Sequence, residues 1–176
     1  MNAPERKKRI AEFGRAPRQL AAALKKIPKA AWAYKPGPER WSIREILVHL
    51  ADSEANGYMR CRWCVAEPGT KVITYDEERW VRELAYQKQD AALATDLFGL
   101  LRKASHQLLR ALPASAGSRT FVHPQHGAMT LDDWLVIYTD HVPNHIRQIE
   151  ATHDAWRKRG TRQAVDPGTS LYRSSR

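Results

Sequence analysis

The chain has 176 residues and a formal net charge of +10, with 43% hydrophobic and 27% charged residues. This length is typical of one domain with a core large enough to fold without disulfides or a structural metal. Two cysteines do not make a disulfide scaffold, the apolar runs are too short for a transmembrane helix, and the N-terminal segment lacks the apolar region of a signal peptide. We therefore expect a cytoplasmic protein that does not bind membranes.

The positive charge is concentrated at the two ends of the chain. Residues 1–28 hold eight basic and two acidic side chains, residues 157–176 hold six and one, and the region between them holds 15 and 16. A protein that recognises nucleic acid is expected to have a basic face in its body, so we expect no specific nucleic-acid partner. Basic ends of this kind are typical of solvated surface, and they also allow non-specific contact with phosphates.

Apolar residues at helical spacing predict four main helices. The first covers about residues 5–27, although Pro17 disfavours its middle. The second starts after Ser42, which is placed to form a capping box with Glu45, and it ends near residue 66.

A long connection over residues 67–87, with a helical stretch at 76–85, leads to a third helix over about residues 90–112. One stripe of this helix is rich in leucine, which predicts that the stripe is buried (Leu97, Leu100, Leu101, Leu108 and Leu112). Residues 119–129 then predict a short extended excursion around a turn that contains proline and glycine.

The fourth helix starts after Thr130, which pairs with Asp133 as a second capping signal, and it runs to about Arg159. Residues 160–176 show no periodicity, and we expect a basic C-terminal tail without regular structure. The sequence therefore predicts an all-α, antiparallel four-helix bundle over residues 1–159, with long connections and an extended excursion before the last helix. Such bundles often hold metal or ligand sites between facing helices.

Three histidines are candidates for one metal site. His141 and His145 are one helical turn apart beside the apolar stripe of the fourth helix, so their ring nitrogens can meet at one point, as in helical His-x-x-x-His metal sites. Chance also produces this spacing, with each ring bonded to a polar neighbour. His49 adds a third imidazole at the margin of the apolar arc of the second helix. Three histidines and a water make an open site of the catalytic type.

Pro143 lies between the two histidines of the fourth helix and removes a backbone hydrogen bond to Thr139. A strong kink would turn His145 away from His141. A mild bend would leave both rings facing one point.

Other chemistry-bearing residues have competing interpretations. Cys61 and Cys64 form a C-x-x-C motif near the end of a helix, where the thiol pKa is not lowered, so we interpret them as core packing. His123 and His126 fit either a second metal site or a turn between strands. Further candidates for acid, base or supporting roles are Asp52, Glu54, Tyr75, Asp76 and Asp140.

Residues 37–54, 123–131 and 141–149, together with the connector that holds Tyr75 and Trp80, resemble the DinB superfamily of DinB-like, YfiT-type metal-dependent enzymes. Residues 37–54 (GPERWSIREILVHLADSE) resemble the second-helix signature of that family. Residues 123–131 (HPQHGAMTL) and residues 141–149 (HVPNHIRQI) resemble its later segments in the same order, as does the connector with Tyr75 and Trp80. The resemblance covers about residues 5–156.

The resemblance implies a four-helix bundle, often dimeric, with one divalent metal held by three histidines, which correspond to His49, His141 and His145. Some relatives are S-transferases for low-molecular-weight thiols such as bacillithiol or mycothiol, and others are thiol-dependent isomerases. We therefore expect a divalent cation, zinc or nickel first and iron or manganese second, that activates either a water, for a hydrolase, or a thiol, for an S-transferase. The expected partners are a small-molecule substrate and a second copy in a homodimer. The alternative is a non-catalytic metal-binding or stress-response bundle that meets acidic partners through its basic ends.

Overall fold

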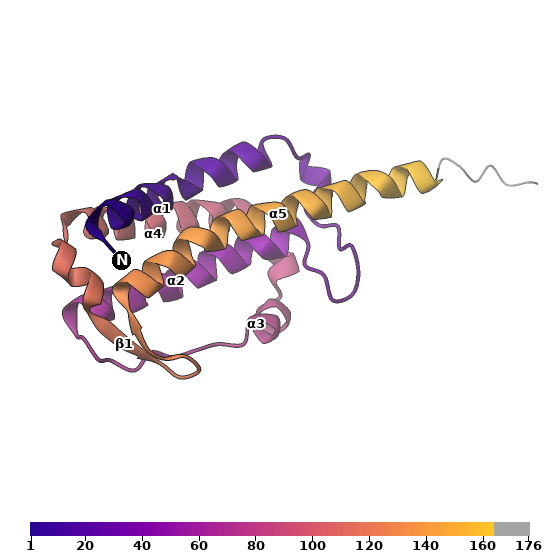
Figure 1. The fold of residues 1–176 in the computed structure, drawn as a ribbon. Helices are drawn as coiled ribbons and strands as arrows, with labels where there is room; N and C mark the ends of the chain where they lie inside the picture. The colour runs from indigo at the N-terminus through magenta and orange to yellow at the C-terminus, as the bar shows by residue number, and fades with distance from the viewer. Residues whose placement is uncertain (164–176) are drawn as a thin grey trace, which may run out of the picture.

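The computed structural model describes residues 1–163 and has the predicted bundle architecture (Figure 1). Its long helices are α1 (Ala3–Leu24), α2 (Ile43–Ala66), α4 (Ala91–Ala111) and α5 (Leu131–Gln163). A short helix, α3 (Glu77–Glu83), lies in the connection from α2 to α4. An antiparallel hairpin of β1 (Thr120–His123) and β2 (Gly127–Thr130) precedes α5, with Phe121 paired to Met129. Single 3-10 turns complete the connections (Lys29–Ala31, Tyr86–Lys88 and Ala114–Ser118).

Capping interactions fix where the two site-bearing helices start. At α2, the Glu45 backbone N–H donates to Ser42 Oγ at 3.1 Å, and the Ser42 N–H donates to Glu45 Oε2 at 2.7 Å. At α5, the Asp133 N–H donates to Thr130 Oγ1 at 3.0 Å, and the Thr130 N–H donates to Asp133 Oδ2 at 2.8 Å. Both predicted helix starts are confirmed, because reciprocal bonds of this kind satisfy donors of the first turn that have no partner within the helix.

Two helix ends differ from the prediction. Helix α1 ends at Leu24 and keeps Pro17 inside it, so the first helix is shorter than residues 5–27. Helix α5 continues to Gln163, past the predicted end at Arg159. The remainder of the predicted tail, residues 164–176, lies outside the described residues. No helix within residues 1–163 combines the length and the apolar character needed to cross a membrane.

Helix α4 buries a different face from the predicted leucine stripe. Leu97 and Leu100 are 43% and 67% exposed. The buried face of α4 carries three small residues, two large apolar residues and one arginine that pairs with Glu54 of α2 (Ala91, Ala94, Ser105, Phe98, Leu109 and Arg102). The prediction is therefore wrong for Leu97 and Leu100, whereas Leu108 and Leu112 are partly buried against the core. A partner on α2, rather than leucine content, decides which side of α4 is fully buried.

Helices α2 and α5 lie side by side in the bundle (Figure 1). Ile46 and Leu50 of α2 share one apolar cluster with Val142 and Ile149 of α5, and all four side chains are buried. Packing of these neighbours turns the polar side chains between them toward the α2–α5 interface.

Candidate metal centre

Three imidazole rings from α2 and α5 meet at this interface. His141 Nε2 lies 3.3 Å from His49 Nε2 and 3.0 Å from His145 Nε2. One nitrogen from each ring lies within 4.8 Å of the other two. In a tetrahedral zinc site with Zn–N bonds near 2.0–2.1 Å, two ligand nitrogens are about 3.3 Å apart. Within residues 1–163, this is the one group of three or more His, Cys, Asp or Glu with such spacing.

The close contacts between the ring nitrogens are better explained by a shared cation than by hydrogen bonds between the rings. A neutral imidazole has one N–H. His145 Nδ1 lies 2.9 Å from Gln148 Oε1, which assigns the N–H to Nδ1 and leaves a lone pair on Nε2. If His141 carries its N–H on Nε2, that group can donate to either His49 Nε2 or His145 Nε2 but not to both. The other pair of nitrogens then lies in close contact without a hydrogen bond. A cation among three lone pairs removes this conflict.

The burial of the rings keeps them neutral. Desolvation, with a smaller contribution from the neighbouring His145, lowers the pKa of His49 to about 3. Burial is also the main reason that the pKa values of His141 and His145 are lowered from the usual histidine range. The neutral ring is the form that binds a metal ion, so the cluster is in its ligating form at neutral pH.

The metal-free protein should become less stable as the pH falls from 7 to 5. Since the pKa of His49 is lowered in the folded state, the unfolded chain binds the proton first, and stability is lost as the pH drops below about 6.5. For His49 the loss at pH 5 is about 2 kcal/mol. Urea unfolding at pH 7 and pH 5 measures the loss in the free energy of unfolding. In a His49→Asn variant this loss should be smaller by about 2 kcal/mol. An equal loss in both proteins would contradict the burial of a neutral ring.

Trp41 covers one side of the cluster. Its ring centroid lies 4.8 Å from that of His49, and its plane is within 7° of the His145 ring at 6.3 Å. The indole Nε1 donates to Glu78 Oε2 of α3 at 3.2 Å. In the sequence, Trp41 stands directly before the α2 cap and within the 37–54 segment that resembles the family. Its contact with the histidines depends on tertiary packing.

A cavity of about 250 Å³ opens beside the cluster, and His141 forms part of its wall. Arg60 of α2 and Glu77 of α3 also line it. The Arg60 Nη2 atom donates to the Ile73 carbonyl at 2.8 Å, whereas its Nε is buried and has no partner among the described residues. Glu77 is exposed at the surface, and partial desolvation of its carboxyl, and next the charge of the neighbouring Glu78, raises its pKa. The cavity therefore offers a donor for an anionic group and a carboxyl that binds protons readily.

Some of the other predicted candidates lie in this cavity wall. His123 and His126 sit at the hairpin turn with their ring centroids 4.7 Å apart, and both line the cavity. They join no third ligand within the described chain. Tyr75 lines the same cavity and packs against Trp80 at 4.3 Å.

The remaining candidates are engaged elsewhere. Glu54 pairs with Arg102 in the core, Asp140 pairs with Arg9 at the surface, and Asp52 accepts from the Tyr86 hydroxyl. Asp76 caps α3 by accepting from the Arg79 N–H. None of these acids is directed at the histidines by a contact in residues 1–163.

The two cysteines are buried, reduced core residues. Burial raises the pKa of Cys61 to about 12 and that of Cys64 to about 11. A thiol with a raised pKa is unreactive at neutral pH. This agrees with the packing interpretation of the C-x-x-C motif.

Pro143 does not separate the two histidines of α5. The helix is continuous through it from Leu131 to Gln163. The ring centroids of His141 and His145 are 4.5 Å apart, with perpendicular planes. The sequence left open either a strong kink or a mild bend at Pro143. The structure has no kink that separates the rings, and both histidines face one point.

Comparison with known proteins places this architecture in a family. The DinB superfamily sequence model matches residues 12–149. A protein of Oceanobacillus iheyensis is 32% identical over 109 residues, or 62% of this chain and 63% of the relative, and one of Bacillus licheniformis is 28% identical over 150 residues, or 84% of each. Both are named "putative metal-dependent hydrolase". The match thus spans less than two thirds of the first relative.

A solved structure has the same fold. YfiT from Bacillus subtilis, described as a probable metal-dependent hydrolase with an unusual four-helix bundle topology, superposes with a TM-score of 0.80. The superposition covers 91% of this chain and 90% of YfiT at 25% sequence identity. The predicted family and bundle are confirmed, and the role of His49, His141 and His145 as metal ligands stays a prediction.

Proposed function

The chain belongs to the DinB superfamily, and we propose that it is a metal-dependent hydrolase of a small molecule, with one divalent cation held by His49, His141 and His145. The convergence of the three Nε2 atoms is the observation that carries the proposal. The names of the relatives favour hydrolysis over thiol transfer. When bound, the cation would act as a Lewis acid and lower the pKa of a coordinated water.

The cavity beside His141 is the proposed substrate site. Its volume of about 250 Å³ lies slightly below the range of about 300–1,000 Å³ that is usual for small-molecule sites, so we expect a small substrate. The unpartnered Nε of Arg60 would bind an anionic or carbonyl oxygen of the substrate. Glu77, with its raised pKa, would take a proton from the attacking nucleophile. Trp41 would limit the access of bulk water from the other side of the rings.

Hydrolysis of chromogenic 4-nitrophenyl esters and phosphoesters tests the proposal. We expect turnover by the zinc- or nickel-loaded chain without added thiol, no turnover after chelation, and a loss of at least about 100-fold in kcat for Glu77→Gln. Glu83→Gln, an exposed change on the same helix, is the matched control. Turnover that requires an added low-molecular-weight thiol would identify an S-transferase instead. Metal binding with no turnover of any substrate would favour the non-catalytic bundle.

Gln148 should tune metal affinity without being a ligand. Its Oε1 accepts from His145 Nδ1 at 2.9 Å and so fixes which ring nitrogen faces the cluster. Loss of a partner of this kind lowers metal affinity by about 10- to 100-fold. We expect that effect for Gln148→Ala in a zinc titration, whereas Gln107→Ala, on the exposed surface of α4, should bind zinc as the native chain does. Native affinity in Gln148→Ala would show that the bond does not orient the ring.

A further inference from the structure

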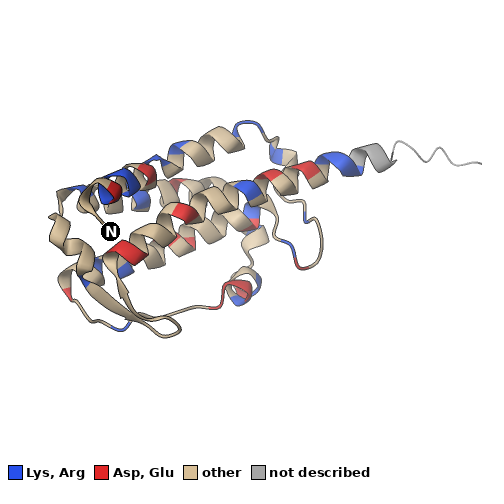
Figure 2. Ribbon diagram, viewed as in Figure 1, with Lys and Arg blue, Asp and Glu red and all other residues tan. Residues whose placement is uncertain are grey.

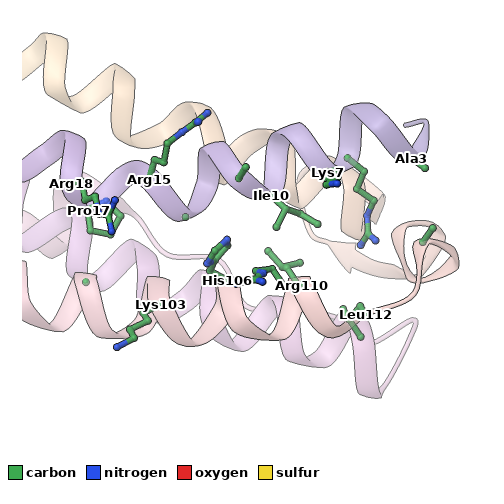
Figure 3. Close-up of a pocket in the computed structure, with 16 residues that line it drawn as sticks. Ala3, Lys7, Ile10, Arg15, Pro17, Arg18, Lys103, His106, Arg110 and Leu112 are labelled. Atoms are coloured by element: carbon green, nitrogen blue, oxygen red, sulfur yellow. The ribbon is translucent and has the colours of Figure 1, made fainter.

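A larger groove lies between α1 and α4, and it shares no lining residue with the cavity beside the histidines (Figure 3). Its volume is about 900 Å³, within the range of about 300–1,000 Å³ that is usual for small-molecule sites. The apolar part of its wall comes from both helices and the segment after α4 (Ile10, Ala11, Pro17, Leu109, Leu112 and Ala114).

The charged residues of the groove are all cationic. Lys and Arg gather along α1 (Figure 2), and no acidic side chain of residues 1–163 lines the groove. In Figure 3, Ile10 and His106 lie between the helices, whereas Arg15 and Lys103 point away from them. The outward pair therefore contributes to the field around the groove rather than to its contacts. The cations that line the groove are Arg6, Lys7, Arg15, Arg18, Lys103 and Arg110.

Arg6, which lines the groove, carries a donor without a partner among the described residues. It is 5% exposed, and its Nε donates to Asp132 Oδ1 at 2.8 Å. Its Nη2 is buried without a partner within residues 1–163. The N-terminal amine of Met1 also lies 3.5 Å from Asp132 Oδ2, so one carboxylate faces two cations. A buried donor without an acceptor is costly, and an anionic oxygen at this point would satisfy both the donor and the excess charge.

Two glycines shape the apolar part of the groove. A Cβ at Gly14 would lie 2.5 Å from His106 Nε2, so glycine lets this ring lie against α1. Burial, and next the charge of Arg110, lowers the pKa of His106, which favours the uncharged ring. A Cβ at Gly99 would meet nothing within 4 Å. The groove is thus open above α4 at Gly99.

We propose that this groove binds a small amphiphile with one anionic head group, a carboxylate or a phosphate. The head group accepts from Arg6 Nη2 and lies near Arg110, and the apolar chain lies over Ile10 and Leu109. Nη2 is shielded from solvent, so only a compact head group would fit against it, which favours a small ligand over an acidic protein surface. The function of this site is separate from the hydrolysis proposed above.

Octyl phosphate is a suitable probe, titrated calorimetrically into the full chain. We expect one saturable site, with binding at least about tenfold tighter than that of either 1-octanol or inorganic phosphate, which each lack one half of the recognised chemistry. The His141→Ala variant should bind the probe as the native chain does. If 1-octanol bound as tightly as octyl phosphate, the groove would have no anion site, and the proposal would be overturned. If His141→Ala lost binding of octyl phosphate, the phosphate would bind at the histidine cluster instead of the groove, which would also overturn the proposal.

Two matched pairs of variants locate the ligand. Gly99→Leu should fill the groove and weaken binding by at least about tenfold, while Gly99→Ala stays within about twofold of the native chain. Arg110→Glu should weaken binding by about tenfold, and Lys88→Glu, the same charge change outside the groove, should leave it within about twofold. If the two variants of either pair changed the affinity for octyl phosphate equally, the ligand would not lie in the groove as proposed. Sedimentation that shows a native dimer and a monomeric Gly99→Leu, with no probe bound, would assign the groove to a second copy instead.

Discussion

Replacing His141 by alanine is expected to abolish tight binding of a divalent cation while the bundle stays folded. Its Nε2 is within 3.3 Å of both other ring nitrogens, so its loss removes the central ligand of the proposed three. Since loss of a supporting partner alone costs 10- to 100-fold in affinity, we expect loss of a ligand to exceed about 100-fold. Elemental analysis of the purified protein and a zinc titration measure the change.

The matched control is His153→Ala, on the same helix. The His153 ring packs on Trp156, 5.9 Å away between centroids, and belongs to no cluster of potential ligands in the described part of the chain. This variant should bind a full equivalent of metal, and circular dichroism should show equal helix content in both proteins. A full equivalent of tightly bound zinc or nickel in His141→Ala would refute the three-histidine site.

The sequence predicted the bundle well because its strongest signals are local. The capping pairs Ser42–Glu45 and Thr130–Asp133 act over three residues, and both are present as predicted. The exposure of Leu97 and Leu100 on α4 differs from the prediction for the opposite reason. Arg102 reaches Glu54, which is 48 positions away, and no periodicity within α4 reveals that partner.

The difference between local signals and long-range contacts also explains how much of the candidate site the sequence predicts. The spacing of His141 and His145 fixes their relative position on one helix, so a local rule was sufficient. His49 was tied to them by its place near the core margin and by the family resemblance. The sequence assigns no individual role to Gln148, Trp41, Arg60 or Glu77, because the role of each depends on which elements pack around the rings.

Replacing Arg102 by methionine should destabilise the fold by about 3–5 kcal/mol, because it leaves the charge of Glu54 buried and unpaired. Arg102 is fully buried and Glu54 is 1% exposed. The guanidinium donates to both carboxylate oxygens, at 2.8 and 2.5 Å, and to the Tyr138 carbonyl at 3.0 Å. It also lies 4.0 Å from the centre of the Phe13 ring. The pair therefore connects α2 and α4 to the helix that carries His141.

Urea unfolding of three variants separates charge from packing. Arg110→Met, an exposed change on the same helix, should alter the free energy of unfolding by less than about 0.5 kcal/mol. Arg102→Met should show the full loss, and the double variant Arg102→Met/Glu54→Leu should recover part of it, since no charge is then left buried. A double variant no more stable than Arg102→Met would mean that lost packing on Phe13, rather than the unpaired carboxylate, causes the loss. In that case α4 would be oriented by ring stacking and not by the ion pair.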